Sequence, residues 1–115
     1  MLKQKQTVLG GNGNCWSTCL ACLLNIKTDD VPNFVALYKG DWYTKAQEWL
    51  ADRGYTLVYH NQRLVPKKLP KRLSIAVGYS PRYVTRGHAV IYKRGRPYWD
   101  VHEDETFLRG DIWAI

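Results

Sequence analysis

The sequence lacks the long apolar segment that a membrane-spanning helix needs. Nowhere do its 115 residues reach the roughly 18 uninterrupted apolar positions of such a helix. The opening stretch, MLKQKQTVLGGNGN, also lacks the apolar run of a secretory signal peptide. These absences argue against a membrane protein and against a secreted one, so we expect a cytoplasmic protein with no membrane partner.

Cysteine is scarce, and its pattern excludes a disulfide framework. The three cysteines are Cys15, Cys19 and Cys22, an odd number crowded into one short segment. A zinc site is disfavoured because their spacing, even with a histidine added, resembles no common finger or ribbon. The cluster-binding loop of radical iron–sulfur enzymes is disfavoured because the residues between these cysteines continue an apolar helix. We expect reduced thiols, no metal and no cofactor.

Acidic residues are few beside the basic ones. The chain has 17 Lys and Arg against 10 Asp and Glu, a formal net charge of +7, and this excess favours an acidic partner. The densest basic run, 67–72, is broken by proline, which is typical of a solvated loop. Nucleic-acid binding is therefore a less favoured alternative, and its affinity would fall steeply with salt.

Apolar and aromatic residues are plentiful. The composition is 45% hydrophobic, with five Trp and eight Tyr, which is typical of a folded chain and not of a disordered one. The length suits one compact domain and is too short for two. We expect residues 1–115 to form a single domain around one core.

Three helical segments are predicted in the first half of the chain, at 15–24, 31–38 and 42–53. The first has no Gly or Pro and follows a glycine-rich loop, with Asn14 in the position of a helix N-cap. The second follows a turn at 28–30 and tolerates Pro32 in its first turn. The third repeats apolar residues at spacings of three and four, and Gly54 favours its end.

Strand patterns fill the second half, at 55–60, 73–79, 88–93, 97–102 and again near the C-terminus. The turn KRGRP, at 93–97, predicts a hairpin between the third and fourth of these strands. Helices first and strands afterwards indicate an α+β fold, in which N-terminal helices pack on a largely antiparallel sheet.

Cys15 is the candidate nucleophile. A free thiol, with a pKa of roughly 8.5, is mostly protonated at neutral pH, but the positive end of a helix favours the thiolate. The glycines before Cys15 leave room for a substrate, and free backbone N–H groups there can face an oxyanion. Cys19 and Cys22 fall on the same helix face, deeper in the domain, and we expect them to be small core residues.

His88 is the favoured candidate base among the three histidines. It follows Gly87 and opens an apolar strand, so its imidazole is expected at the rim of the sheet. Across the hairpin, Asp100 is expected to reach the ring nitrogen that faces away from the cysteine. His102 shares a strand face with Asp100 and is the second choice, because the acidic residues after it predict a solvated segment.

The stretches GNCWSTCLACLLNI, DDVPNF, GHAVIY and WDVH together resemble the papain-like cysteine peptidase superfamily. The pattern is similar to compact bacterial members such as the double-glycine leader peptidases, and to small proteins of bacteria and their phages. The resemblance implies a papain-like fold and a cysteine peptidase-like hydrolase that cleaves an amide or related acyl bond of a peptide or protein substrate.

Carried over by position, the resemblance implies Cys15 as nucleophile, His88 as base and Asp100 as the residue that orients the histidine. It also implies an upstream glutamine as oxyanion donor. Gln6 is the candidate, although it lies further from the cysteine than that glutamine usually does. The alternatives are Asn12, Asn14 and the Cys15 backbone N–H. A second interpretation is a catalytically silent binding module on the same scaffold, such as a phage inhibitor of a host protein.

Overall fold

A computed structural model describes residues 1–10, 13–57, 60–63, 73–81, 87–94 and 96–114, with the backbone alone for 60–63 and 109–114. Its elements in chain order are α1 (Cys15–Leu24), the 3-10 turn η1 (Thr28–Asp30), α2 (Phe34–Tyr38), the 3-10 turn η2 (Lys39–Asp41), α3 (Trp42–Ala51), β1 (His60–Arg63), β2 (Leu73–Tyr79), β3 (Gly87–Lys93), β4 (Arg96–Trp99) and β5 (Arg109–Ala114). In these ranges no helix combines the length and the apolar character needed to cross a membrane.

The helices follow the sequence prediction closely at α1 and less closely at α2. Helix α1 spans the predicted residues. Helix α2 begins only at Phe34, because Asn33 takes the N-cap position and its side chain accepts a hydrogen bond from the Ala36 N–H. Pro32 therefore precedes the helix instead of lying in its first turn. Helix α3 ends at Ala51, and Gly54 follows with a φ of +80°, which glycine adopts readily.

The strands form one antiparallel sheet in the order β1-β5-β2-β3-β4. The α+β expectation and the β3–β4 hairpin are therefore confirmed. The predicted strand at 55–60 is wrong for residues 55–57, and 58–59 lie outside the described residues. The reason is visible at Leu57, whose N–H and C=O both bond the side-chain amide of Gln47 in α3, so neither is left for a strand ladder.

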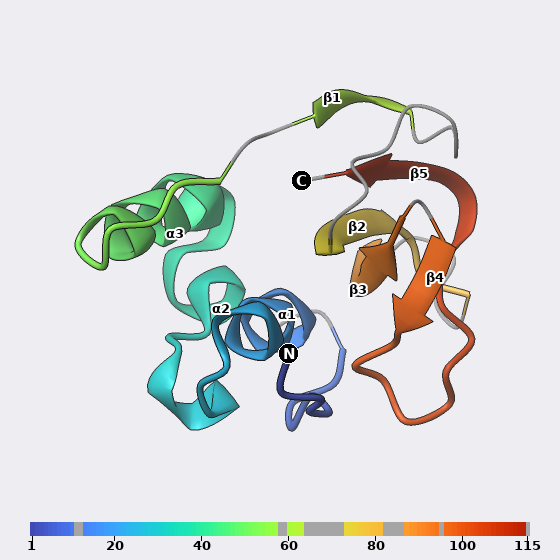
Figure 1. Cartoon of the computed structure of the whole chain (residues 1–115), viewed down its shortest axis with the longest axis horizontal. Coiled ribbons are helices and arrows are strands. Elements are labelled where there is room, and N and C mark those ends of the chain that lie inside the picture. The colour runs from blue at the N-terminus through green and yellow to red at the C-terminus, as the bar shows by residue number, and fades with distance from the viewer. Residues whose placement is uncertain (11–12, 58–59, 64–72, 82–86, 95, 115) are drawn as a thin grey trace.

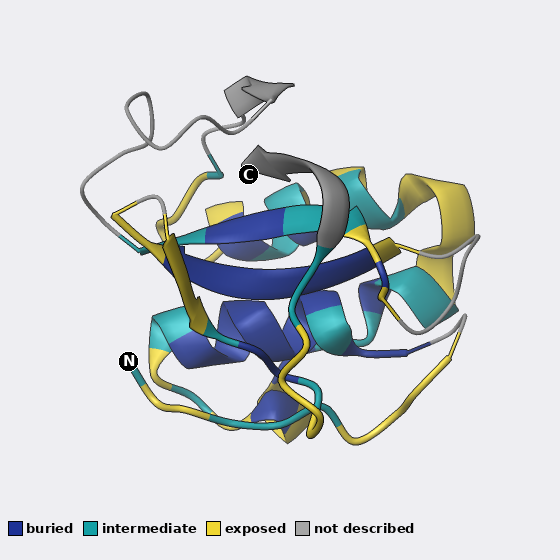
Figure 2. Cartoon of the chain, turned by 90° about the vertical axis from the view of Figure 1, so that its right-hand side faces the viewer, coloured by how far each residue is buried: buried dark blue, intermediate teal, exposed yellow. Residues whose placement is uncertain are grey.

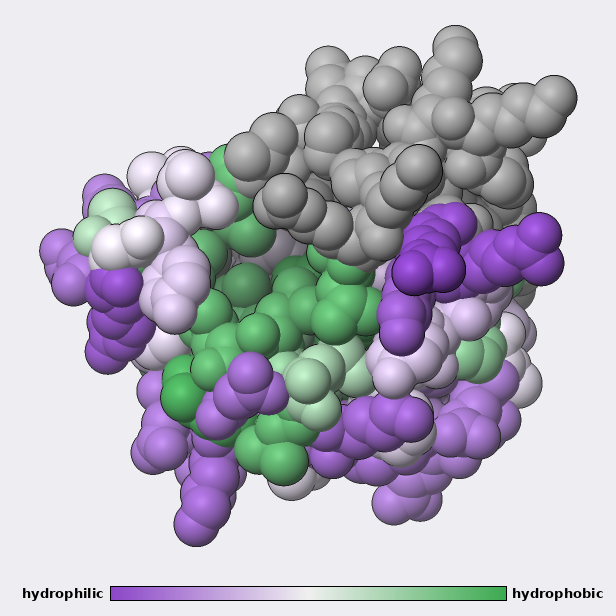
Figure 3. All heavy atoms as spheres, in the orientation of Figure 1, coloured by the Kyte–Doolittle hydropathy of each residue, from purple (hydrophilic) through white to green (hydrophobic). Residues whose placement is uncertain are grey.

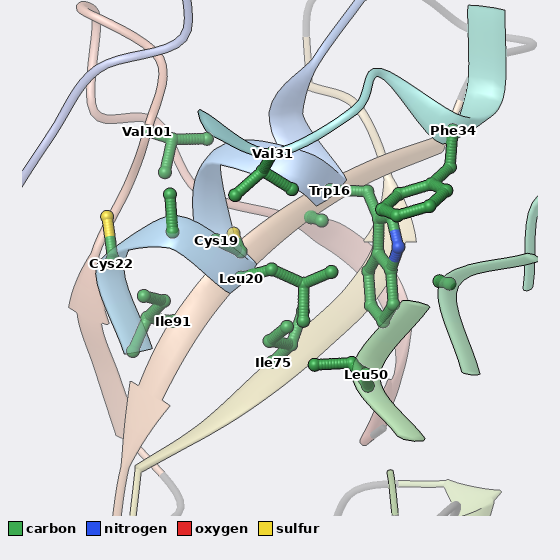
Figure 4. Packing of buried hydrophobic residues seen from close by; sticks show 13 residues of the cluster. Trp16, Cys19, Leu20, Cys22, Val31, Phe34, Leu50, Ile75, Ile91 and Val101 are labelled. Carbon is green, nitrogen blue, oxygen red and sulfur yellow. The ribbon is translucent and has the colours of Figure 1, made fainter. Parts of the chain in front are cut away.

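The helices lie on one side of the molecule and the strands on the other, with α1 between (Figure 1). Buried residues concentrate in α1 and in the central strands β2 and β3 (Figure 2). The main core joins these layers and includes Trp16, Leu20, Phe34, Leu50, Ile75 and Ile91 (Figure 4). Cys19 and Cys22 are fully buried in it, which confirms them as core residues.

Candidate functional site

His88 and Asp100 form a buried pair at the open end of the β3–β4 hairpin. The Nε2 atom of His88 lies 2.7 Å from Oδ1 of Asp100, and their side chains are only 4% and 0% exposed. The contact is not the cross-strand pairing that the hairpin predicts. Strand β4 ends at Trp99, before the predicted end at 102, and the register shifts between Ile91 and Tyr92. Asp100 reaches His88 from the bend that follows the strand.

The carboxylate of Asp100 is held by backbone donors as well as by His88. Its Oδ1 also accepts the His102 N–H at 2.9 Å, and its Oδ2 accepts the Phe107 N–H at 2.8 Å. Burial raises the pKa of Asp100, but the hydrogen bonds from His88, His102 and Phe107 outweigh burial and lower the pKa below its ordinary value. Asp100 therefore carries its negative charge at neutral pH.

Two acceptors set the protonation of His88. Burial lowers the pKa of His88, but the hydrogen bonds to Asp100 and to the Cys15 sulfur raise it more, to about 9. Because Nε2 bonds Asp100, the remaining ring nitrogen, Nδ1, is the one available to Cys15. The imidazole thus stands between a carboxylate and a thiol, and it is positively charged at neutral pH.

Cys15 is the first residue of α1 and is partly exposed, whereas Cys19 and Cys22 are buried. Within the described residues no side chain caps α1, so the N–H groups of its first turn are not covered by a capping oxygen. Burial raises the pKa of Cys19 well above the ordinary thiol value. Of the three thiols, Cys15 is the one placed for chemistry.

A pocket of about 350 Å³ contains both Cys15 and His88 in its lining. Among the described residues, the rest of its lining is apolar side chains and glycine backbone: Gly10, Gly13, Trp16, Val35, Trp42, Val77, Gly87 and Ala89. Trp16 and Trp42 meet edge to face, with ring centroids 5.0 Å apart. Apolar surface also gathers on the face of the molecule viewed in Figure 3. Apart from His88, the described lining is uncharged, and it places two aromatic rings next to the thiol.

The loop before Cys15 is tightly folded around Gly13. A Cβ atom on Gly13 would lie 2.9 Å from the carbonyl oxygens of both Val8 and Gly10, so only glycine fits there without a shift. The backbone of the loop closes through hydrogen bonds from Gly13 N to Gly10 O and from Asn14 N to Val8 O. This loop fixes where Cys15 and the start of α1 lie.

Neither Gln6 nor Asn14 is among the residues that line the pocket, and Asn12 lies outside the described residues. Asn14 occupies the N-cap position but does not cap α1 with its side chain, contrary to the expectation. Its Oδ1 instead accepts the N–H groups of Thr7 and Val8, and its Nδ2 donates to Thr7 Oγ1, so Asn14 ties the loop together. Gln6 donates from Nε2 to Val8 O at 2.9 Å, which directs its amide into the same loop.

His102 is turned away from the role of base. Its Nδ1 lies 3.1 Å from Asp104 Oδ1, and its ring stands 6.3 Å from that of His88, centroid to centroid. The chain bends after Trp99, so the strand alternation that would align His102 with Asp100 does not apply. Its side chain is 16% exposed, so it is less solvated than predicted. The side chain of His60 lies outside the described residues.

The sequence did not predict the backbone N–H groups that bind Asp100, nor the pocket residues that α2 and α3 contribute, Val35 and Trp42. The Phe107 N–H has no sequence signal, whereas the regular spacing of Trp42 in α3 marks it as inward-facing. The basic run 67–72 lies outside the described residues. Among the described residues, no three His, Cys, Asp or Glu gather as a metal would require.

The chain was compared with family models, curated proteins and solved structures. It matches no family model, no curated protein and no solved structure.

Proposed function

We propose that this protein is a cysteine-dependent hydrolase of papain-like design that cleaves an amide or related acyl bond. The observation that carries the proposal is the buried 2.7 Å contact between His88 and Asp100, together with the pocket that Cys15 and His88 both line. The site therefore brings together a nucleophile, a base and a group that orients the base. The arrangement resembles the one that the sequence pattern implies for papain-like cysteine peptidases.

The reaction begins with Cys15 as thiolate and His88 as imidazolium. The sulfur attacks the substrate carbonyl, forming a C–S bond, and the carbonyl π electrons move to the oxygen. When this intermediate collapses, the carbon–nitrogen bond breaks and the Nδ1 proton of His88 passes to the departing amine. Water then gives a proton to Nδ1 and attacks the thioester, which releases the acid and restores the thiolate. Asp100 holds the Nε2–H throughout and keeps the ring in one orientation.

Backbone N–H groups at the start of α1 are the oxyanion donors that this geometry favours. They belong to the residue that bears the nucleophile and to its first helical turn, where the helix dipole adds positive potential. The side chains of Gln6 and Asn14 would first have to leave Val8 O and Thr7 Oγ1, to which they donate. We therefore assign the side chains of Gln6 and Asn14 to the loop and the donor role to the backbone.

The pocket selects for an uncharged, apolar group beside the scissile bond. No charged residue other than His88 is among its lining residues within the described part of the chain. A cationic group placed there would lose its hydration without gaining a partner. A peptide or protein with an apolar side chain at this position is the substrate class that fits. The free cysteines fit a cytoplasmic site of action.

Thiol alkylation tests the proposal without a known substrate. The folded protein is treated with iodoacetamide from pH 5 to 9, and mass spectrometry reports which cysteine reacts. Cys15 should be labelled selectively near pH 6, and His88→Ala should weaken that labelling. Cys19 and Cys22 are internal controls because both are buried. Slow labelling of Cys15 that follows an ordinary thiol pKa, and is unchanged by His88→Ala, would favour a silent binding module on the same scaffold.

A further inference from the structure

The N-terminal segment joins the helical layer to the loop that carries Asp100. On the helical side, the Leu2 N–H donates to Cys22 O, and the Gln4 side-chain amide donates to Ile26 O. On the sheet side, the Gln4 carbonyl accepts the Trp99 indole N–H at 2.8 Å, and the Gln6 N–H donates to Val101 O at 2.8 Å. The segment therefore contacts the helix that carries the nucleophile and the residues on either side of the orienting acid.

Lys5 lies in the middle of this segment and binds the Asp100 loop from outside. Its Nζ donates to the Asp100 carbonyl at 2.8 Å, to the His102 carbonyl at 3.1 Å and to Glu105 Oε1 at 3.1 Å. The same atom lies 4.2 Å from the centroid of the Trp99 ring. All three ammonium protons of Lys5 are thus used on one loop.

The loop that Lys5 binds contains two residues in an unfavourable backbone conformation. Glu105 and Phe107 have φ angles of 53° and 59°, a left-handed conformation that costs residues other than glycine conformational energy. The same loop presents the His102 and Phe107 N–H groups to the carboxylate of Asp100. A cation that binds two carbonyls of this loop stabilises the backbone arrangement that fixes the carboxylate, because hydrogen bonds from a charged donor are roughly twice as strong as neutral ones.

We propose that Lys5 is a positioning residue, which holds the loop of residues 100–107 so that the carboxylate of Asp100 faces His88. The inference rests on the proposed function, since the geometry that it preserves is that of Cys15, His88 and Asp100. The Lys5–Glu105 ion pair is not the operative contact, because Glu105 is more than half exposed and such pairs contribute little. The two backbone carbonyls carry the effect.

Three variants distinguish this positioning role from a nonspecific effect of removing a positive charge or of changing the packing against Trp99. Lys5→Met keeps the length and the apolar contact with Trp99 but removes every donor, whereas Lys5→Arg keeps a cation with donors. Lys3→Met is the matched control, because the Nζ of Lys3 also lies over the Trp99 ring, at 5.2 Å. No hydrogen bond from Lys3 to the Asp100 loop occurs among the described residues.

The first readout is the rate of Cys15 alkylation as a function of pH. Lys5→Met should slow labelling near pH 6 several-fold, because Asp100 would no longer hold His88 in the orientation that faces the Cys15 sulfur. Labelling above pH 9, where an ordinary thiol is ionised, should be nearly unchanged. Lys5→Arg should recover most of the rate at pH 6, and Lys3→Met should match the parent protein. Equal effects of Lys5→Met and Lys3→Met, or no effect of either, would overturn the role of Lys5.

The second readout is hydrogen exchange of the His102 and Phe107 amides, which donate to Asp100. Lys5→Met should speed their exchange while leaving the Val90 amide in β3 protected, and unchanged exchange would contradict the inference. If Lys5→Met does not fold, Lys5→Gln is compared with Lys5→Arg in the same two assays. If Cys15 is not labelled selectively in the parent protein, the proposed function itself is refuted. Failure of the proposed function is thereby distinguished from failure of the role proposed for Lys5.

Discussion

The imidazole of His88 and the carboxylate of Asp100 meet at 2.7 Å, and both side chains are almost completely buried. Removing one partner from such a pair leaves the other buried and unpaired, which is costly. The pair therefore links the stability of the fold to the protonation of the candidate base. Its contribution can be followed through the pH dependence of unfolding.

The pH dependence follows from the two shifted pKa values. The pKa of His88 is raised from 6.5 to about 9, so its contribution is complete below pH 6.5 and is lost as the pH rises through 9. The pKa of Asp100 is lowered from 3.8, so its contribution is present above pH 3.8 and is lost as the pH falls through its folded value. Stability from the pair should therefore be greatest between about pH 4 and 6.5.

Asp100→Asn should remove most of this dependence. We expect urea unfolding of the parent protein to lose on the order of 3 kcal/mol between pH 6.5 and 9.5 from His88, and the variant to lose much less. The pKa of His88, measured by NMR, should fall toward 6.5 in the variant. The difference between the two proteins is the measured quantity, because other groups titrate in both. Parallel stability curves would contradict the assignment.

Substitution of Gly13 should disturb the loop that places Cys15. A methyl group there would lie 2.9 Å from two carbonyl oxygens, so Gly13→Ala should lower the free energy of unfolding by about 1–3 kcal/mol. Gly40→Ala is the matched control, because no atom lies within 4 Å of its added Cβ. Thermal melts and Cys15 labelling near pH 6 should both change for Gly13→Ala and stay constant for Gly40→Ala.

Substitutions of Cys15 and Cys19 in α1 should have different effects, one on reactivity and the other on stability. Cys19 is fully buried, so Cys19→Ala should leave a small cavity and cost about 1–2 kcal/mol of stability, while labelling of Cys15 continues. Cys15→Ala should abolish labelling at pH 6 and barely change the urea midpoint, because Cys15 is partly exposed. Loss of reactivity from both substitutions, without unfolding, would point to a shared role that the proposed mechanism does not contain.

Apolar reagents should reach Cys15 faster than small polar ones. We expect N-benzyl iodoacetamide to label Cys15 several-fold faster than iodoacetamide, because the benzyl group gains contact with the pocket wall. Trp42→Ala should reduce this ratio by removing part of that wall. The unfolded protein in urea is the reference for the intrinsic reactivity of each reagent. A ratio no greater in the folded protein than in urea would argue against the apolar pocket as a substrate site.

Local signals were sufficient for α1 and for the β3–β4 hairpin. The boundaries of α1 follow from a glycine-rich loop and an uninterrupted apolar helix, and burial of Cys19 and Cys22 follows from their spacing. The hairpin brings His88 and Asp100 to the same end of the sheet because a short turn joins its strands. Each of these features is decided within a few residues along the chain, so it can be read from sequence.

Tertiary structure alone decided what holds the candidate site in place. Gln47 takes the backbone bonds of Leu57 that a strand would need, and Asn14 bonds Thr7 and Val8 instead of capping its helix. Lys5 binds the Asp100 carbonyl across 95 positions of sequence. Such contacts depend on how distant segments pack and leave no periodic or turn pattern in the local sequence. The sequence by itself therefore determined the candidate nucleophile and base, whereas the packing of the folded chain determined their supports.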